Sequence, residues 1–376
     1  PKNILPLQLG YSSSGEVVQT GKGVSDFHTG DRVVSNGNHA EYVVVNQNLC
    51  TRIPDNTDIK EASFTVLGSI ALHGLRLSET SLGSKVVVIG LGIIGQLVCR
   101  LAEAQGSEVI GIDPDTKRTD MSANFYTSVE EANMTNVDSV IITAATSSNE
   151  PIEVATKIAR NKAKIVVVGD IPLNISRNDF YYKELELVVS KSYGPGRYDK
   201  QYEILGKDYP IEYVRWTENR NFEAFIKLLS QNQIHLLDLV TEEVSFENAP
   251  SIYKKFSGED KPLSIVLRYD NKSEPKIDLQ RTVELEPKTE KVNLGILGAG
   301  NFASTTILPI LKELKKDCQV LGIASSTGLS SESLATNFKI KNKYPTEEEI
   351  LNSEEIDAVL ILTPHFNHSE LVIKAL

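Results

Sequence analysis

Two glycine-rich segments constrain the fold of this 376-residue chain more than any other feature of its sequence. Residues 90–95 (GLGIIG) follow the apolar run 85–89, and residues 298–303 (GAGNFA) follow the apolar run 293–297. After each segment, apolar residues recur at helical spacing. In such a strand–turn–helix unit the glycines let the backbone approach a pyrophosphate, and the helix N-terminus stabilises the anion. We therefore expect two dinucleotide-binding units, the alternative being glycine turns in ordinary strand–helix units.

An acidic residue follows the first turn at the position that contacts the ribose. Asp113 lies at the end of the next expected strand, 108–112. A carboxylate there accepts hydrogen bonds from ribose hydroxyls and repels a 2′-phosphate, which favours NAD over NADP. The alternative is a helix cap before Pro114. The expected cofactor contacts at this turn are Gly90, Gly92, Ile93, Ile94, Gly95 and Asp113.

The second turn lacks such an acidic residue. Ser325 and Ser326 stand where it is expected, and no arginine lies nearby in the sequence to bind a phosphate. The cofactor at the second site is therefore either NAD or NADP. The expected contacts there are Gly298, Gly300, Asn301, Phe302, Ala303 and Ser325.

Hydrophobic patterning divides the chain into segments. Short alternating runs, among them residues 41–45, fill the start of the chain and are typical of a small β-barrel or sandwich. Further along, strand and helix patterns alternate in two separate regions, which predicts an α/β fold with two parallel sheets covered on both faces. A polar, charged stretch between these regions is typical of a linker. The expected segments are the barrel-like residues 1–67 and 236–269, the first sheet domain 68–235, the linker 270–291 and the second sheet domain 292–376.

Charge and cysteine content argue against several function classes. With 39 basic and 50 acidic residues, the chain has a net charge of −11 and no basic surface for nucleic acid or an anionic membrane. Its three cysteines lie far apart, which favours free thiols in a reducing compartment. The opening residues lack the pattern of a secretory signal. We expect a cytoplasmic protein and, because the chain starts at Pro1 and stops inside a helical pattern at Leu376, a fragment.

The first 270 residues resemble the medium-chain dehydrogenase/reductase family. The resemblance rests on residues 15–18 (GEVV), 30–33 (GDRV), 40–42 (AEY) and the first glycine turn. It implies an NAD(P)-dependent oxidoreductase in which a partial GroES-like β-barrel accompanies a Rossmann-type domain. Where that family usually has Gly-His-Glu with a zinc-binding histidine, this chain has residues 10–12 (GYS), and the other usual ligands are also missing. The resemblance is thus to the zinc-independent branch, and no zinc is expected.

The last 86 residues resemble the nucleotide-binding domain of the Gfo/Idh/MocA family, through the second turn, 356–359 (IDAV) and 363–368 (TPHFNH). By this resemblance, Thr363, Pro364 and His368 contact the ribose and nicotinamide of the cofactor. The two halves together resemble the bi-domain oxidoreductases, which are associated with cell-surface sugar metabolism. The resemblance implies a small sugar- or polyol-like substrate and leaves open whether the chain forms a homo-oligomer.

Hydride transfer needs a group near the nicotinamide that stabilises or protonates the substrate oxygen. Tyr11 and Ser12 are the first candidates because they occupy the place of the missing zinc ligand, although a turn with satisfied hydroxyls is the alternative. His73 is a further candidate, but a histidine on an apolar helix is usually packed in the core. These three residues are the expected catalytic side chains.

A second group of candidates follows the expected strand 185–189. Ser192, Tyr193 and Gly194 lie beyond its carboxyl end, where open α/β sheets bind ligands, so we expect them beside the nicotinamide. Arg197 and Arg215 are candidates for binding an anionic substrate, whereas surface ion pairing is the commoner role of an arginine. The chain is thus expected to be an oxidoreductase, the alternative being a dinucleotide-binding scaffold or sensor without turnover.

Overall fold

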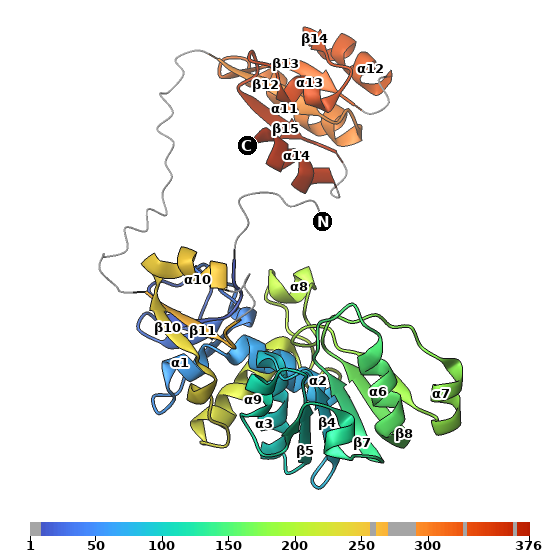
Figure 1. The fold of residues 1–376 in the computed structure, drawn as a ribbon. Coiled ribbons are helices and arrows are strands. Elements are labelled where there is room, and N and C mark those ends of the chain that lie inside the picture. The colour runs from blue at the N-terminus through green and yellow to red at the C-terminus, as the bar shows by residue number, and fades with distance from the viewer. Residues whose placement is uncertain (1–8, 256–260, 270–290, 326–328, 364–366) are drawn as a thin grey trace. The chain divides into compact units, whose positions relative to one another are not determined.

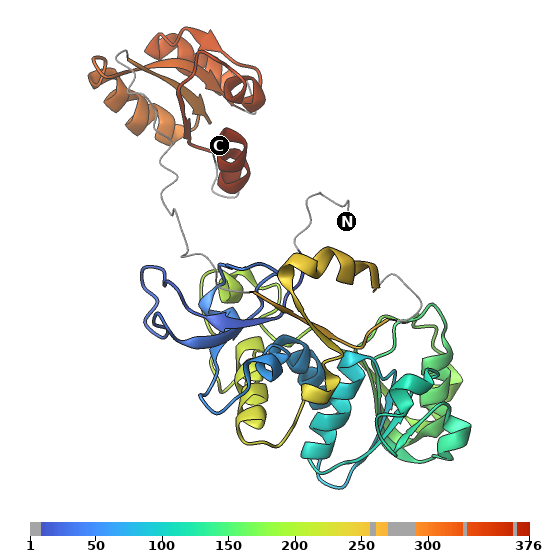
Figure 2. The same ribbon diagram turned by 60° about the vertical axis from the view of Figure 1, so that its left-hand side comes forward.

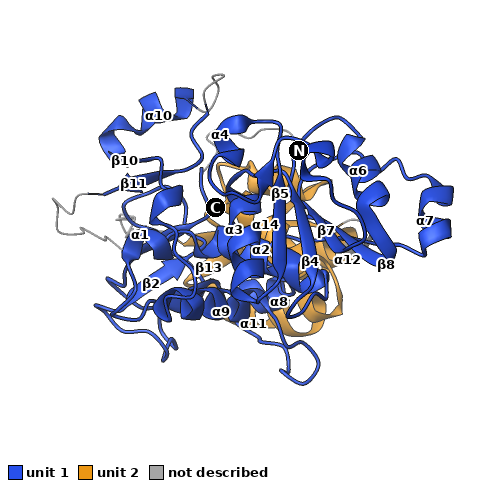
Figure 3. Ribbon diagram, turned by 60° about the horizontal axis from the view of Figure 1, so that its bottom comes forward, with its two compact units in different colours: residues 1–274 blue, residues 275–376 orange. Residues whose placement is uncertain are grey.

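The computed structural model describes residues 9–255, 261–269, 291–325, 329–363 and 367–376. The chain forms two compact units, residues 1–274 and residues 275–376, which Figure 3 shows in separate colours. Each unit contains a parallel sheet with helices packed on it (Figure 1). The finer division into barrel-like segments, sheet domains and linker stays a prediction.

The first unit is built on a six-stranded parallel sheet. Its strands are β4 (Lys85–Ile89), β5 (Glu108–Ile112), β6 (Phe125–Tyr126), β7 (Val137–Ile142), β8 (Ala159–Val167) and β9 (Glu186–Val189). Their spatial order is β6-β5-β4-β7-β8-β9, so the chain first extends the sheet on one side of β4 and then on the other. In open sheets, ligands bind at such a reversal, beyond the carboxyl ends of the strands.

Helices cover both faces of this sheet (Figures 1 and 2). Side chains alternate along β4, so Val86 and Val88 enter one buried cluster while Val87 and Ile89 enter another on the opposite face. The predicted α/β class with doubly wound parallel sheets is confirmed. Packed on the Val86 face are α2 (Thr65–Leu77), α3 (Ile93–Ala104) and α9 (Glu218–Ser230), and on the other face α6 (Glu150–Ile158).

Shorter helical segments connect these elements. No helix among the described residues combines the length and the apolar character needed to cross a bilayer. The connecting segments are α1 (Ile59–Ala62), α4 (Thr116–Thr119), α5 (Val129–Ala132), α7 (Arg177–Lys183), α8 (Lys200–Glu203), α10 (Ala249–Lys255) and the single turns η1 (Gln47–Leu49), η2 (Leu237–Leu239) and η3 (Phe246–Asn248).

Two small sheets complete the first unit. Strands β1 (Ser13–Glu16), β2 (Arg32–Ser35) and β3 (Cys50–Arg52) are antiparallel, whereas β10 (Glu242–Ser245) and β11 (Ile265–Arg268) pair in parallel. The expectation of a strand at residues 41–45 is wrong, because this segment adopts no strand conformation and Val44 is fully exposed. An alternating sequence forms a strand only where another strand satisfies its backbone groups, and no described strand pairs with this segment.

The second unit repeats the reversal on a smaller scale. Its parallel sheet has the order β14-β13-β12-β15, so β13 and β15 flank the strand that precedes the second glycine turn. The strands are β12 (Val292–Leu297), β13 (Cys318–Ala324), β14 (Asn342–Lys343) and β15 (Ala358–Ile361). The helical segments are the π-helical turn η4 (Ala303–Ile307), α11 (Leu308–Glu313), α12 (Leu329–Phe338), α13 (Glu347–Leu351) and α14 (His368–Ala375).

Candidate functional site

The three glycines of the first turn have different surroundings. Gly90 has φ +96°, and a Cβ atom there would lie 2.6 Å from the backbone nitrogen of Ala144. At Gly95, a Cβ atom would lie 1.9 Å from the Gly90 carbonyl oxygen, so helix and strand pack closely. At Gly92, the nearest atom to a Cβ would be Arg118 Nη1 at 3.6 Å. Gly92 is therefore the least crowded of the three glycines, with only the flexible end of the Arg118 side chain beside it.

Helix α3 begins directly after this turn with an uncapped N-terminus. Gly92 is its N-cap and has no side chain to accept the first amides, and Ile93 and Ile94 form the first helical positions. Such amides point outward and carry the positive end of the helix dipole. The turn thus offers backbone donors suited to a pyrophosphate, and binding at Gly90 to Gly95 stays a prediction.

The carboxylate of Asp113 lies against the same turn. Asp113 Oδ2 accepts a hydrogen bond from the Leu91 amide at 2.7 Å, and Oδ1 accepts one from the Asp115 amide at 3.0 Å. Sequence reasoning missed Arg118, whose Nη1 lies 3.4 Å from Asp113 Oδ2. The signal that could have identified Arg118 was its position five residues after Asp113, in the next helix. The Arg118 guanidinium therefore offsets part of the negative charge of Asp113.

The fold brings His73 of α2 next to the loop after β9. Gly194 has φ +113°, and a Cβ atom there would lie 3.3 Å from His73 Nδ1 and 2.8 Å from Asn221 Nδ2. Asn221, fully buried on α9, donates to the Tyr193 carbonyl at 2.9 Å and accepts from Arg76 Nε at 3.0 Å. Burial, helped by the charge of Arg76, lowers the pKa of His73 to about 4. His73 is therefore neutral at neutral pH, able to hydrogen-bond but carrying no charge.

Tyr193 forms a buried wall of this loop. Its ring packs on Phe222 at a centroid distance of 5.4 Å, and burial raises its pKa to about 12. The Tyr193 hydroxyl has no hydrogen-bond partner among the described residues, although Asn36 lies near enough to influence its pKa. Ser192 precedes it in a left-handed conformation, with φ +51°. The hydroxyl is thus a buried group left for a ligand or a water.

Glu218, the first residue of α9, is a second buried polar group that sequence reasoning missed. Its side chain is fully buried, and neither carboxyl oxygen has a hydrogen-bond partner among the described residues. Burial raises the pKa of Glu218 to about 8, and the Glu203 carboxylate adds to the rise while Arg197 and Lys191 oppose it. An acid at the start of a helix usually serves the helix dipole, so its position gave no signal of this environment.

The two arginines predicted to bind substrate have different surroundings. Arg197 forms a 2.6 Å ion pair with Glu203, and its guanidinium carbon lies 4.2 Å from the centre of the Tyr198 ring. Arg215 is exposed and stacks on Trp216 at 3.8 Å. The structure therefore leaves Arg215 freer than Arg197 to meet a substrate anion, and both roles stay predictions.

The other two predicted catalytic residues lie in a loop beside the small antiparallel sheet. Ser12 Oγ donates to the Ser63 carbonyl at 2.6 Å, and the Tyr11 side chain is 52 % exposed. Gly10 packs against the ring of His39, which in turn hydrogen-bonds to the hydroxyl of Tyr253. The catalytic roles of Tyr11 and Ser12 stay predictions.

The second glycine turn has a comparable geometry. Gly298 has φ +105°, and a Cβ atom there would lie 2.8 Å from the Leu362 carbonyl, whereas a Cβ atom at Gly300 would meet nothing within 4 Å. The hydroxyls of Ser325 and Thr363, beyond β13 and β15, are buried and have no partner among the described residues. Of the remaining predicted contacts, Asn301 is exposed, Phe302 is 58 % exposed and Ala303 is buried. A ring nitrogen of His368 lies 2.8 Å from the Thr363 carbonyl oxygen. Pro364 lies outside the described residues.

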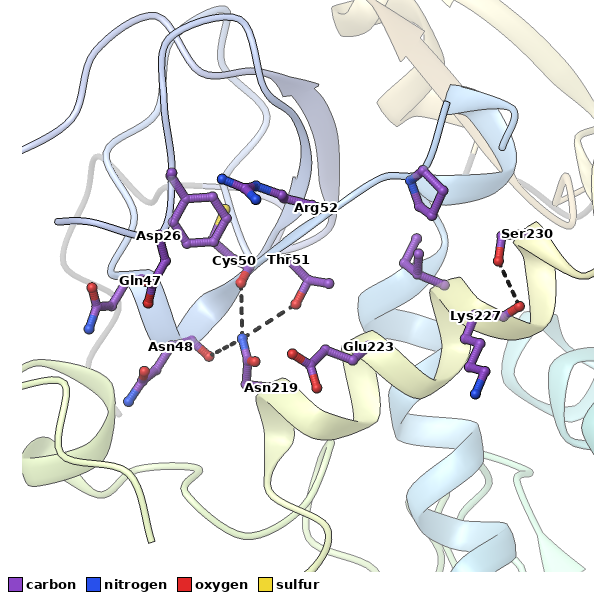
Figure 4. A pocket seen from close by; sticks show the side chains of 13 residues that line it. Asp26, Gln47, Asn48, Cys50, Thr51, Arg52, Asn219, Glu223, Lys227 and Ser230 are labelled. Carbon is purple, nitrogen blue, oxygen red and sulfur yellow. Dashed lines mark hydrogen bonds between the residues drawn. The ribbon is translucent and has the colours of Figure 1, made fainter. Parts of the chain in front are cut away.

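A pocket of about 510 Å³ opens elsewhere in the first unit, between β3 and α9 (Figure 4). Asn219 points from α9 toward β3 and donates to the carbonyl oxygens of Asn48 and Cys50. Glu223 and Lys227 line the same side along the helix. None of the predicted site residues lines this pocket, so it is separate from the glycine turn and from the loop after β9.

Three family models match separate parts of the chain. Residues 1–55 match the alcohol dehydrogenase GroES-like domain, and residues 68–178 match the NAD-binding domain of D-isomer specific 2-hydroxyacid dehydrogenases. Residues 292–376 match the Gfo/Idh/MocA oxidoreductase family with its NAD-binding Rossmann fold. These matches support a bi-domain oxidoreductase with two nucleotide-binding domains.

Individual proteins resemble the first unit. D-guloside 3-dehydrogenase of Escherichia coli strain K12 is 26 % identical over 272 residues, which cover 66 % of this chain and 73 % of that protein. The crystal structure of galactitol-1-phosphate dehydrogenase from Escherichia coli superimposes with a TM-score of 0.59 at 20 % identity, covering 70 % of this chain and 85 % of the other. The structural likeness establishes the fold of this unit.

The expectation that the chain uses no zinc is contradicted. Residues 1–55, which include the segment 10–12 behind that expectation, match the GroES-like domain of alcohol dehydrogenases. Similar structures include zinc dependent alcohol dehydrogenase 2 from Streptococcus pneumonia, with a TM-score of 0.55 at 16 % identity over 71 % of this chain and 84 % of the other. Within the part of the chain that the structure describes, no three His, Cys, Asp or Glu side chains gather, so these residues alone do not fit the ion. The similarity to the GroES-like domain and to a zinc dependent enzyme shows that missing sequence motifs were too weak a basis for excluding the metal.

Proposed function

We propose that the first unit is an NAD(P)-dependent oxidoreductase that moves hydride between the nicotinamide and an alcohol or carbonyl carbon of a sugar- or polyol-like substrate. The observation that carries this proposal is the first glycine turn at the point where the sheet order reverses, with an uncapped α3 beyond it. The names of the relatives, among them a guloside dehydrogenase and a galactitol-1-phosphate dehydrogenase, support the substrate class.

In this proposal the cofactor extends from the turn to the loop after β9. Its pyrophosphate binds the amides around Gly92, and its adenosine ribose binds Asp113 and Arg118. Asp113 favours NAD at this site, whereas the second turn takes NAD or NADP. The nicotinamide of the cofactor at the first site lies near Tyr193 and Gly194. The nicotinamide supplies the redox chemistry, and the protein binds and orients it.

Neutral His73 then acts beside the nicotinamide as a hydrogen-bonding group that orients the substrate or cofactor. Its low pKa excludes a cationic role at neutral pH. Tyr11 and Ser12 stay candidates for polarising the substrate oxygen. From the sequence alone, we also propose that the protein is cytoplasmic and forms a homo-oligomer.

Binding of NADH by a Gly92→Ala variant tests the proposal. The substitution adds one methyl group 3.6 Å from Arg118 Nη1, an ordinary van der Waals contact, so we expect folding to be unaffected and the Kd for NADH at the first site to rise at least about tenfold. Gly21→Ala is the control, because its Cβ atom meets nothing within 4 Å and Gly21 lies outside the site. Fluorescence titration with NADH measures binding, and a scan of sugars and polyols measures turnover.

The outcomes separate the two functional hypotheses. Equal affinity of Gly92→Ala and the unaltered chain would show that the turn does not hold a pyrophosphate. Tight, Gly92-dependent binding without turnover of any sugar or polyol would favour the dinucleotide-binding scaffold or sensor instead.

A further inference from the structure

Two guanidinium groups flank the indole of Trp216. The guanidinium carbon of Arg76 lies 3.3 Å from the ring centre, and that of Arg215 lies 3.8 Å from it. Both guanidinium groups therefore lie within cation–π distance of the same indole. Each gains from the negative face of the indole, which holds the guanidinium planes in place.

No carboxylate of the described residues forms an ion pair with either of these two arginines. The neighbouring arginines are paired, Arg197 with Glu203 and Arg220 with Asp208, but neither Arg76 nor Arg215 has an acidic group within ion-pair distance among the described residues. Burial and the like charge of Arg215 lower the pKa of Arg76 to about 10. Arg76 is partly buried and Arg215 is exposed, and neither has an acidic partner among the described residues, so the two guanidiniums are available to an anionic ligand.

The pair is attached to the proposed nicotinamide end of the site. Arg76 Nε donates to Asn221 Oδ1, and Asn221 packs against Gly194 and holds the Tyr193 carbonyl. Arg76 also follows His73 by three residues on α2, so the two side chains share one helix face about one turn, roughly 5 Å, apart. An anionic group held at Arg76 therefore lies about one sugar ring from a carbon beside His73.

We propose that Arg76 and Arg215 bind the anionic group of the substrate, so that the substrate is a sugar carrying a phosphate or carboxylate rather than a neutral polyol. This inference rests on the proposed function, because it places the reacting carbon beside His73. Planar guanidiniums bind both oxyanions through paired hydrogen bonds. Arg197, engaged by Glu203, is not part of this pair.

Trp216 is the only tryptophan of the chain, so its fluorescence reports directly on this pair. We would titrate the full chain, with and without NADH, with inorganic phosphate, galactose 6-phosphate, galacturonate and galactose, against sodium chloride at equal ionic strength. Phosphate and at least one charged sugar should change the Trp216 emission saturably, whereas galactose and chloride should not. Tighter binding of galactose 6-phosphate would identify the phosphate as the recognised group, and tighter binding of galacturonate would identify the carboxylate.

Two variants complete the test. Arg215→Ala should weaken binding of the charged sugar at least about tenfold while leaving the Kd for NADH unchanged. Arg177→Ala, which removes another arginine stacked on an aromatic ring, Tyr181, is the matched control and should change neither value. Galactose binding as well as its charged derivatives, phosphate leaving Trp216 unaffected, or Arg215→Ala binding the charged sugar normally would each overturn the inference. Failure of the proposed function is distinguishable, because it appears as loss of NADH binding while Arg215-dependent anion binding remains.

Discussion

At the scale of single residues, the site combines polar groups that share one property: their charge or hydrogen bonding is incomplete. The Tyr193 hydroxyl and both oxygens of Glu218 are buried without partners among the described residues, and Arg76 is partly buried without an acid. Such groups cost free energy unless a ligand or water completes them. Their clustering around one loop therefore supports a binding role better than any one of them does.

The pH dependence of stability tests the burial of Glu218. Its carboxyl has a pKa of about 8 in the folded chain against 4.5 as a reference, so the folded state holds the proton more tightly. The contribution of Glu218 to the free energy of unfolding should be most favourable below pH 4.5, and it should be lost as the pH rises from 4.5 to about 8. Glu218→Gln should abolish this loss and stabilise the first unit at pH 8 by about 5 kcal/mol at most, with little effect at pH 4.5.

Urea unfolding at the two pH values measures this difference. Glu223→Gln on the exposed face of the same helix is the control and should change neither midpoint. An equal effect of Glu218→Gln at both pH values would mean that the carboxyl is ionised and solvated in the folded protein.

Cofactor choice is the second prediction at this scale. Asp113→Asn removes the negative charge that repels a 2′-phosphate and leaves Arg118 with Asp115 as its remaining acidic partner. The ratio of NADPH to NADH affinity at the first site should rise at least about tenfold. Fluorescence titration with both nucleotides measures the ratio, with Asp120→Asn on the exposed end of the next turn as control. An unchanged ratio would show that Asp113 does not contact the ribose.

At the scale of elements, two helices and one turn build the site. Helix α2 presents His73 and Arg76 on one face, and α9 presents Glu218, Asn221 and Phe222 on the face that meets the loop after β9. The turn between β4 and α3 contributes backbone amides instead of side chains. In each helix, the backbone periodicity places the contributing side chains on one face, so spacing along the sequence indicated parts of the site.

The glycines of the turn should differ in what they contribute. Gly90→Ala forces an alanine into a left-handed conformation and its Cβ to within 2.6 Å of the Ala144 nitrogen. It should lower the free energy of unfolding by about 2–3 kcal/mol, whereas Gly92→Ala should leave it nearly unchanged. Thermal unfolding of both variants without nucleotide measures the contrast. Equal destabilisation would mean that Gly92 is a structural glycine and not an open binding position.

At the scale of the whole molecule, the same arrangement of a strand, a glycine turn and a helix occurs in two separate units. In each unit a glycine with φ near +100° follows the central strand, and a Cβ atom on the next glycine of the turn would meet either nothing within 4 Å, at Gly300, or only Arg118 Nη1 at 3.6 Å, at Gly92. The geometry of the second turn therefore supports a second nucleotide site that is independent of the first.

Stoichiometry tests this independence. The unaltered chain should bind two molecules of NAD(P)H, and Gly92→Ala and Gly300→Ala should each bind one at concentrations that saturate the remaining site. A Cβ atom at Gly300 meets no neighbour within 4 Å, so this variant should remain folded. Equilibrium dialysis with NADH and NADPH measures the number bound. One equivalent in the unaltered chain would show that the second turn is only a structural turn.

Much of this organisation was predictable from residues that are close together along the chain. Strands such as Lys85–Ile89 and Glu108–Ile112, the helices after both turns and the doubly wound class follow from local periodicity and glycine placement. Residues 41–45 were predicted wrongly because a strand also needs a partner, which the local pattern does not contain. The exclusion of zinc failed for a similar reason, because it relied on short missing motifs.

Tertiary packing alone decided which distant side chains meet. Arg76 and Asn221 are 145 positions apart, and no spacing rule joins them, yet their hydrogen bond links α2 to the loop that holds Tyr193. The same packing removed water from Glu218 and so raised its pKa. Backbone conformation depends mainly on neighbours in the chain, whereas desolvation and contact between charges depend on everything that folding brings near, and the chemistry of a site follows from the latter.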